Sequence, residues 1–400
     1  MMSSVTTHTT SAITCEIIRD AQHLAALSPE WEALVNGSQY EAFTGPHWFA
    51  AWKTALPVSS LACVTARRDG QLVGVLPFGR RRSGFRNLFM SIDAPFASGD
   101  YLAPIVREEF VDDVLPLMLR ALRTHLGQRT VLWWPNVPCE ARGYAALRRY
   151  LDTEGMQHFE EHEVAPRLRI EGRSYAELEA SWSKSLRTDV RRQTKRLEAL
   201  GNLELHEPST REEALATLEE FFEVHDEKWR SQGFPGLFET EAQRRLYREI
   251  VGGTWGGQLY FTTLRLDGRN ISFGIAFRAG GWVQWYRPSY RAELENYSPG
   301  KVHVAMVIRD AVEAGMTGMD FLLGGEKYKY QWTNEEGRVA SICAARSPWA
   351  PKYAWFATIK PFMRNRLAAR LAWLLGKVSR VRARFAPSTR PSRGERQNPS

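Results

Sequence analysis

The sequence predicts an α+β protein with two similar domains, each a mostly antiparallel mixed sheet flanked by helices. The length of 400 residues exceeds what one ordinary hydrophobic core accommodates. Apolar residues make up 44% and charged residues 24% of the chain, which is typical of globular proteins. The order of expected elements also occurs twice along the chain, which favours two packed domains of one type.

Five segments are expected along the chain. Residues 1–12 are polar and predicted to be disordered, residues 13–165 form the first domain, and residues 166–346 form the second. Residues 347–385 place apolar residues at helical spacing among basic ones, which predicts a basic amphipathic helix. Residues 386–400 are rich in Pro, Ser and Arg, which predicts a disordered tail.

Hydrophobic periodicity places the elements of the first domain. The clearest signal is Asp69-Gly70 between two runs of β-forming residues, because this dipeptide favours the tight turn of a hairpin. Strands are expected at residues 13–18, 61–67, 71–78, 101–106, 130–134 and 157–170, and helices at residues 23–35, 46–55, 108–126 and 141–154.

The second domain repeats this order and contains a second hairpin signal, Asp267-Gly268. Strands are expected at residues 203–206, 258–266, 271–278, 282–286, 319–323 and 338–346, and helices at residues 183–200, 211–231, 239–251 and 299–314.

One stretch of the second domain carries a pattern associated with ligand binding. A strand ends at Trp285 and Tyr286, and Ser298-Pro299-Gly300 then opens a helix. Ser298 is the expected N-cap, Pro299 suits the first helical position, and Gly300 would let a ligand approach the backbone. A helix start placed after a strand offers free N–H groups and a positive dipole end to phosphate or pyrophosphate.

The net charge of +8 is concentrated at one end of the chain. Residues 346–400 hold thirteen of the 53 Lys and Arg residues and one acidic residue, Glu395, so the remainder is mildly acidic. This distribution argues against a nucleic-acid groove across the whole protein. The four Cys residues include no CxxC pair and the His residues no HExxH motif, so no metal site is expected.

A set of short motifs spreads over residues 170–345: Ser185-Leu186-Arg187, Arg191-Arg192, Arg196-Leu197-Glu198, His225, Trp229, Tyr297-Ser298-Pro299-Gly300, Asp320-Phe321-Leu322-Leu323-Gly324, Tyr328-Lys329 and Trp332. Through them the second domain resembles GNAT acyltransferases, in the CelD-type branch associated with exopolysaccharide or cellulose synthesis. It is also similar to the Fem-type transferases, which add amino acids to peptidoglycan precursors. The first domain matches only in layout.

The resemblance implies an acyltransferase that works by direct transfer and without a metal. It would move an acetyl or other acyl group from acyl-CoA to an amine, or less readily a hydroxyl, of a sugar, amino acid or envelope-polymer precursor. GNAT proteins usually have a glycine-rich pyrophosphate loop, whereas this chain has Ser-Pro-Gly, so acyl carrier protein and aminoacyl-tRNA are alternative donors. A non-catalytic scaffold of a polysaccharide-synthesis complex is a further alternative.

Acyl transfer to an amine needs a base, which predicts a small set of catalytic candidates. Asp320 lies in an apolar strand, where burial would raise its pKa, although it could instead bond a neighbouring backbone group. His225 titrates near neutral pH, but a packed helix histidine is as common. Glu326 is a third candidate base, and His303 is expected to be structural. Tyr328 could protonate the leaving thiolate or simply pack at the surface.

The resemblance also implies binding residues, each with an ordinary structural alternative such as helix capping or aromatic packing. The expected donor-binding residues are Ser298, Gly300 and Lys301, and the expected substrate-binding residues are Trp229, Tyr286, Gly324 and Lys329.

The expected surroundings follow from composition. Four unpaired thiols, a polar start without a signal-peptide pattern and the lack of a long apolar run predict a cytoplasmic protein. The predicted basic helix could contact an anionic membrane surface, or it could cover an apolar patch of the body. The expected partner is a small-molecule or lipid-linked acceptor, and nucleic acid is not expected.

Overall fold

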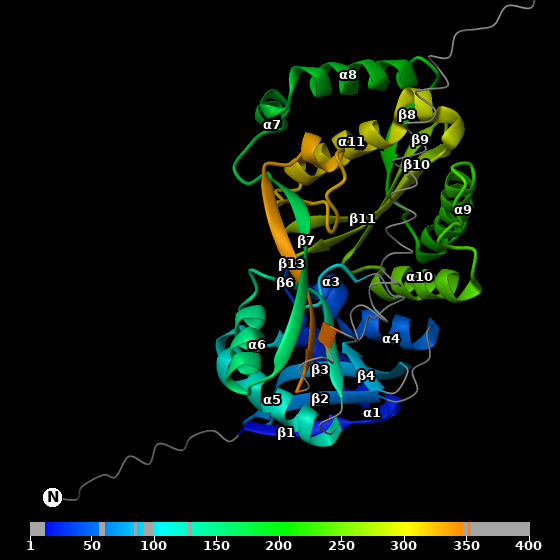
Figure 1. Ribbon diagram of the computed structural model, residues 1–400. Helices are drawn as coiled ribbons and strands as arrows, with labels where there is room; N and C mark the ends of the chain where they lie inside the picture. Colours follow the sequence, from blue (N-terminus) through cyan, green and yellow to red (C-terminus); the bar gives the residue numbers. More distant parts are fainter. Residues whose placement is uncertain are drawn as a thin grey trace, which may run out of the picture.

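A computed structural model describes residues 13–55, 61–83, 86–91, 99–126, 130–346 and 351–352 of the chain, and Figure 1 shows their arrangement. The predicted basic helix at 347–385, apart from residues 351–352, and the two predicted disordered ends lie outside these residues. No helix in the described ranges has the length and apolar composition needed to span a bilayer.

The strands form one continuous mixed sheet with the order β1-β2-β3-β4-β6-β13-β7-β12-β11-β10-β9-β8, and β5 pairs with β3 beside it. Their bounds are β1 Ile13–Ile18, β2 Leu61–Arg68, β3 Gln71–Ser83, β4 Arg86–Ser91, β5 Ile105–Val106, β6 Val131–Pro138, β7 Gln157–Arg169, β8 Leu203–His206, β9 Leu259–Leu266, β10 Arg269–Ala279, β11 Trp282–Tyr290, β12 Gly318–Asp320 and β13 Glu335–Ala345.

Helices cover both faces of this sheet, so the predicted α+β class with helix-flanked mixed sheets is confirmed (Figure 1). Their bounds are α1 Ala21–Ala26, α2 Ser28–Val35, α3 Glu41–Thr44, α4 Pro46–Ala55, α5 Val111–Leu126, α6 Arg142–Thr153, α7 Tyr175–Ser181, α8 Lys184–Glu198, α9 Arg211–Arg230, α10 Glu241–Thr254 and α11 Pro299–Glu313.

The helices divide the hydrophobic core into layers. Helices α5 and α6 pack on one face of the first half, and α7, α8 and α11 pack on the corresponding face of the second half. The opposite face is covered by α1 to α4 in the first half and by α9 and α10 in the second, and these six helices share one continuous apolar cluster. Helix α4 lies against α10 where the halves meet (Figure 1). The junction is therefore a packed core rather than a loose linker.

Strands β7 and β13 carry the sheet from one half into the other (Figure 1). Strand β13, at the end of the second half, pairs antiparallel with both β6 and β7. Strand β7 also pairs with β12. The boundary expected between residues 165 and 166 falls inside β7, and the division into domains stays a prediction.

Local sequence signals explain most element ends. Both predicted hairpins are confirmed, because Asp69-Gly70 and Asp267-Gly268 each place two residues at positive φ, as a type I′ turn requires. Ser183 caps α8 by accepting a hydrogen bond from the Leu186 N–H. The helix expected at residues 23–35 is divided into α1 and α2 at Leu27.

Four elements differ from the expectation. The strand expected to end at residue 78 continues as β3 to residue 83, and β4, which was not expected, follows at 86–91. The strand expected at 101–106 is confined to β5 at 105–106. Helix α7 was not expected, and a capping box of Ser174 and Glu177 opens it. The strand expected at 319–323 ends at residue 320.

Candidate functional site

Two neighbouring strands separate in the second half and open the centre of the sheet. Strands β11 and β12 pair in parallel only from Trp282 opposite Gly318 to Gln284 opposite Asp320. Beyond that point the chain after β12 follows β7, since the Phe321 N–H donates to the Pro166 carbonyl and the Gly324 N–H to that of Val164. Strand β11 runs on to residue 290 along β10 alone. The two strands therefore part beyond Gln284 and Asp320.

A β-bulge lies on β11 directly beyond the parting. Ile275 of β10 is opposite Arg287 and Ala276 is opposite Trp285, so Tyr286 is the extra residue. Trp285 packs in the cluster beneath α11, whereas Tyr286 packs in the opposite cluster with α3, α4 and α10. The bulge changes the direction of the following side chains at the point where β11 no longer pairs with β12.

The turn that leads β12 away from β11 is held by side chains. Leu322 is buried and has a φ of 56°, which is rare and strained for a leucine. The Asp320 Oδ1 atom accepts a hydrogen bond of 2.8 Å from the Leu322 N–H. Lys329 Nζ donates to the Leu323 carbonyl at 2.7 Å and lies 3.0 Å from Glu326 Oε2. These contacts fix the left-handed turn, and with it the separation of the strands.

A row of polar side chains crosses the sheet at the parting. The register places Gln284 of β11, Asp320 of β12 and Arg167 of β7 side by side. Asp320 Oδ2 accepts from Arg167 Nε at 2.9 Å and from the Tyr101 hydroxyl at 2.7 Å. Burial raises the pKa of Asp320, and Arg167, Tyr101 and the Leu322 N–H oppose the rise. Asp320 therefore joins an ion pair, a tyrosine of the first half and the strained turn.

Gln284 has an unsatisfied acceptor in this row. Its Nε2 donates to the Gln39 carbonyl, while its Oε1 is buried and has no hydrogen-bond partner in the described part of the chain. A buried acceptor without a partner costs about 1–3 kcal/mol, so such an atom next to the parting is a candidate ligand contact.

The start of α11 departs from the predicted capping. Ser298 adopts a left-handed conformation with a φ of 49°, and its side chain makes no cap hydrogen bond, so the expected N-cap role is wrong. The Ser298 carbonyl instead accepts from the Lys301 N–H at 2.9 Å. The first turn contains no acidic residue, so its dipole remains available to an anion.

Two other predicted residues at the α11 start also have protein neighbours. A Cβ at Gly300 would lie 3.2 Å from the Tyr290 ring, so a larger residue there would have to displace this ring slightly. The Lys301 ammonium forms an ion pair with Asp189 of α8. Both roles in donor binding stay predictions.

The histidines predicted near the site are packed into the core. His225 is buried, its Nε2 faces the Trp229 indole N–H at 3.0 Å and its Nδ1 faces Asp226 Oδ1 at 3.3 Å. Burial lowers the pKa of His225. His303 lies between the Thr262 and Ser272 hydroxyls, and burial lowers its pKa to about 3, in line with the expected structural role. The structure thus places Trp229 beside His225 rather than beside Asp320.

The remaining predicted residues lie around the parting in different environments. Tyr286 is buried, and its hydroxyl is 3.2 Å from that of Tyr247. Gly324 adopts a φ of 108°, a conformation that requires glycine. Lys329 is buried against backbone carbonyls, whereas Tyr328 is 37% exposed. A buried Lys329 does not fit the expected contact with phosphate in this arrangement, because its ammonium is already engaged.

Sequence reasoning did not identify Tyr101, Arg167, Gln284 and Arg287. Tyr101 and Arg167 lie more than 150 residues from Asp320 in the chain, so only the fold brings them to it. Gln284 and Arg287 carried a usable signal, because each is a polar residue in the apolar strand 282–290.

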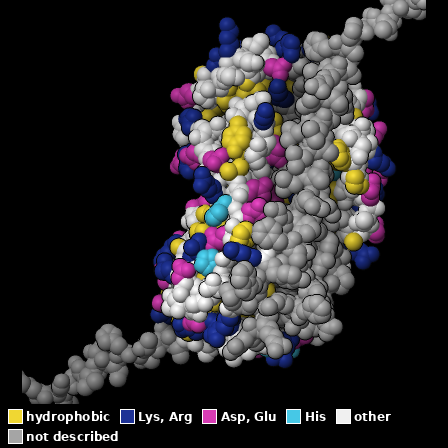
Figure 2. All heavy atoms as spheres, in the orientation of Figure 1, with side chains coloured by type: hydrophobic (Ala, Val, Ile, Leu, Met, Phe, Trp, Pro, Cys, Tyr) yellow, Lys and Arg dark blue, Asp and Glu magenta, His cyan; other side chains and the backbone are white. Residues whose placement is uncertain are grey.

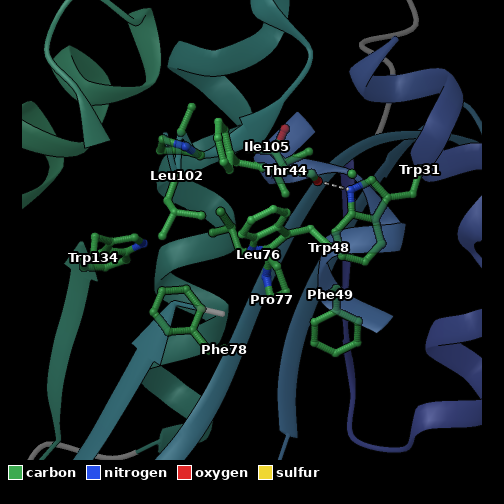
Figure 3. A pocket seen from close by; sticks show the side chains of 14 residues that line it. Trp31, Thr44, Trp48, Phe49, Leu76, Pro77, Phe78, Leu102, Ile105 and Trp134 are labelled. Atoms are coloured by element: carbon green, nitrogen blue, oxygen red, sulfur yellow. Dashed lines mark hydrogen bonds between the residues drawn. The ribbon is translucent and has the colours of Figure 1, made fainter. Parts of the chain in front are cut away.

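Two hollows in the described part of the chain lie away from the parting, and neither is lined by β11, β12 or α11. One encloses about 30 Å³, room for about one water, among aromatic side chains of the first half such as Trp31, Trp48 and Trp134 (Figure 3). The other, of about 390 Å³, lies beside Arg120, Arg123 and Glu154. No group of three His, Cys, Asp or Glu side chains with metal-binding geometry occurs among the described residues.

Comparison with known proteins supports this location of the site. No curated protein matches the sequence. The family profile described as acetyltransferase (GNAT) domain matches residues 184–330, which contain the parting strands and α11. In fold, the chain is similar to the crystal structure of FemX, with a TM-score of 0.60 and 14% identity over 85% of this chain and 99% of FemX.

Two further structures share the fold. The C-terminal domain of a putative lysylphosphatidylglycerol synthetase from Agrobacterium fabrum superposes with a TM-score of 0.53 and 12% identity, over 84% of this chain and 96% of that domain. A conserved protein of unknown function from Bacteroides thetaiotaomicron VPI-5482 has a TM-score of 0.52 and 12% identity, over 82% and 100% of the chains. Residues 184–330 thus match the acetyltransferase (GNAT) domain, within a fold that extends over both halves as in FemX.

Proposed function

We propose that the protein is a GNAT-type acyltransferase that moves an acyl group from acyl-CoA directly to an amine, or to a hydroxyl, of its acceptor. The parting of β11 and β12 at Gln284 and Asp320 is the observation that carries the proposal. A strand edge that has lost its neighbour can offer backbone N–H groups to the oxyanion that develops at the thioester carbonyl. The match of residues 184–330 to the GNAT domain supports this use of the parting.

The start of α11 fits the anionic part of the donor. Acyl-CoA carries a pyrophosphate, and a helix start without acidic residues is favourable for it. The Gly300 N–H would hold this group, with Tyr290 as the adjoining wall. Bound CoA would supply the activated carboxyl group, and the protein would position the acceptor against it.

Asp320 is the base that we propose, through the hydroxyl of Tyr101. The acceptor amine would give a proton to Tyr101 Oη as Tyr101 passes its own proton to Asp320 Oδ2, at 2.7 Å. The raised pKa of the buried Asp320 favours its taking this proton. His225 is less suited, because both ring nitrogens face side chains of its own helix. Tyr328, which is partly exposed, remains the proposed donor to the thiolate.

Titration of acetyl-CoA into the full chain tests the proposal. Calorimetry should show one binding event, and release of the free thiol should follow when an amine acceptor is added. Lys301→Glu is the matched variant, since an acid in the first turn of α11 should weaken binding. Failure of every acyl-CoA to bind would sink the proposal and leave a non-catalytic scaffold as the better interpretation.

An aminoacyl-tRNA-dependent, Fem-type transferase is the second candidate, favoured by the similarity to FemX along both halves. Binding of tRNA that weakens steeply with salt would support it. Acidic and basic side chains are interspersed over the described part of the face in Figure 2, which favours a small donor instead.

The biological setting is a proposal from sequence. The CelD-type resemblance suggests a role in exopolysaccharide or envelope-polymer synthesis, with a sugar, amino acid or lipid-linked precursor as acceptor. The predicted basic helix at 347–385 would bring the enzyme to an anionic membrane surface. Flotation of the full chain with vesicles that contain or lack anionic lipid would test this contact.

A further inference from the structure

We infer that Arg287 binds an anionic group of the acceptor, a carboxylate or a phosphate, beside the parting of β11 and β12. The inference rests on the proposed function for the identity of the molecule that carries the group. The binding of an anion at Arg287 can be tested independently of the proposed function.

Arg287 is a half-buried cation that has only neutral partners. Its Nε donates to the Tyr247 hydroxyl at 2.9 Å, and its Nη1 donates to the Tyr286 carbonyl at 3.3 Å. The guanidinium lies over the Tyr286 ring, 4.1 Å from the centroid. No carboxylate oxygen of the described residues lies within 4.0 Å of it, and Nη2 has no hydrogen-bond partner there.

Three other arginines of this region differ from Arg287 because each forms an ion pair with an acidic side chain. Arg248, one residue beyond Tyr247 on α10, pairs with Glu219 at 2.5 Å. Arg291, at the end of the same strand, pairs with Glu220, and Arg167 pairs with Asp320 at 2.9 Å. Removing a guanidinium from water without a counter-charge costs several kcal/mol, so the missing ion pair at Arg287, near three arginines that have one, is the observation that points to an external anion.

Arg287 has an acidic neighbour that does not form an ion pair with it. Asp100 influences Arg287 through space, but it lies beyond ion-pair distance, and its Oδ2 accepts from the Leu323 N–H at 3.4 Å. The planar guanidinium with an unused Nη2 suits a group that offers two oxygens, as a carboxylate or a phosphate does.

The position of Arg287 assigns this group to the acceptor. Tyr247 and Tyr286 belong to the core cluster on the face of α9 and α10, whereas α11, whose start would hold the donor, packs on the other face with Trp285. Arg287 is three residues beyond Gln284, where the strands part. An acceptor held by Arg287 would therefore present its nucleophile from the side opposite α11.

Thermal unfolding tests anion binding without turnover. Inorganic phosphate and acetate are titrated into the full chain at ionic strength held constant with chloride. At ten times the dissociation constant, the better of the two should raise the melting temperature by about 2 °C in the unmodified protein. Arg287→Met should abolish this rise, and the control Arg248→Met should retain it. Because Met removes an uncompensated charge, Arg287→Met should melt at the same or a higher temperature.

Any of the following results would overturn the inference. No rise in the unmodified protein, an equal rise with Arg287→Met, or loss of the rise in Arg248→Met would each exclude a specific site at Arg287. A melting temperature lowered by more than about 4 °C in Arg287→Met would assign the residue to the fold instead.

Paired acceptors then identify the source of the anion. Acetyl transfer is compared between glycine and glycinamide, and between glucosamine 6-phosphate and glucosamine. In Arg287→Met, KM should rise about tenfold to a hundredfold for the anionic member of the preferred pair, with KM of the neutral member unchanged. Equal effects on both members would overturn the inference. Absence of all transfer would count against the proposed function, while the thermal result would still decide on Arg287.

Discussion

The two halves of the molecule contain the same structural unit, and in the described residues they differ in how its strands continue beyond it. In the first half, β3 pairs antiparallel with β4, β4 pairs in parallel with β6, and α5 connects them. In the second half, β10, β11, β12 and α11 repeat this arrangement. Each parallel pair has three residue pairs in register, from Leu88 opposite Val131 and from Trp282 opposite Gly318. The shared topology therefore does not by itself create a site.

The difference lies in two local features. At the third residue pair the first half has Trp133, and β6 continues to residue 138 beside β13, whereas the second half has Asp320 and then the turn at Leu322. Helix α5 has acidic residues in its first turn, and α11 has none. A strand that ends early and a helix start without acidic residues turn the common unit into a candidate site, and the first half serves as its support.

The largest expected effect is that of replacing Asp320, which belongs to the third residue pair of the second half, with a neutral residue. Asp320→Asn should lower kcat/KM at least about a hundredfold, because it removes the proposed proton acceptor. It should also cost about 2 kcal/mol of unfolding free energy, because the buried charge of Arg167 would keep only the partly exposed Glu140 as an acidic partner. Urea unfolding and a thiol-release assay measure the two effects.

The control for this comparison is Asp310→Asn on α11. Asp310 also accepts from a tyrosine, Tyr260, and lies 3.1 Å from an arginine, Arg278, but its side chain is 39% exposed. Its loss should cost less than about 1 kcal/mol and leave transfer intact. Full activity in Asp320→Asn would remove this residue from the mechanism.

A second difference between the halves should appear on acidification. Helix α5 packs Met118 on Gly74 of β3, whereas α11 buries His303, whose pKa is about 3, between β9 and β10. Unfolding restores the ordinary pKa of His303, so the unfolded chain binds a proton more readily. Its contribution to stability is complete above pH 6.5 and falls as the pH is lowered towards 3.

Urea unfolding at pH 7.5 and pH 5 measures this contribution. His303 should account for a loss of about 2 kcal/mol of unfolding free energy between the two conditions. In His303→Gln, which retains hydrogen-bonding groups for Thr262 and Ser272, this part of the loss should disappear. Equal pH dependence in the two proteins would show that His303 is not the titrating group.

Periodicity and turn chemistry predicted most of the fold because these signals are local. The hairpins at Asp69 and Asp267 required only a dipeptide between two β-forming runs. The place of β13 between β6 and β7 had no such signal, since strand order depends on contacts between residues about two hundred positions apart. The end of β12 at Asp320 was missed because Leu322 is a poor indicator of a left-handed turn.

The candidate site was predictable only in part for the same reason. Two apolar strands located the centre of the site. The strand that contains Tyr286 is followed by a helix start, and the strand that contains Asp320 comes after that helix. The capping role of Ser298 was wrong, since sequence rules assume an extended N-cap and this residue is left-handed. Arg167 and Tyr101 come from distant segments that only the assembled sheet brings to Asp320.

A third, smaller effect tests whether the helix starts differ in function. Lys301→Glu gives α11 an acid in its first turn, as α5 has. It should weaken CoA binding about tenfold, or about 1.4 kcal/mol, through repulsion of the pyrophosphate. Lys301→Gln, which lacks the new charge, should weaken binding less. Equal affinity in all three proteins, measured by calorimetry, would place the pyrophosphate elsewhere.

The smallest effect is expected where the first half lacks a site. Asp112 in the first turn of α5 is about half exposed and pairs with Arg142 at 2.8 Å, so Asp112→Asn should change the unfolding free energy by about 0.5 kcal/mol or less. Removing this acid makes the start of α5 more favourable to an anion. If the first half held a second, weaker donor site, calorimetry would then reveal additional CoA binding. We expect one CoA per chain in both proteins, because β6 continues beside β13 past the position at which β12 turns away, although it is bulged at Asn136.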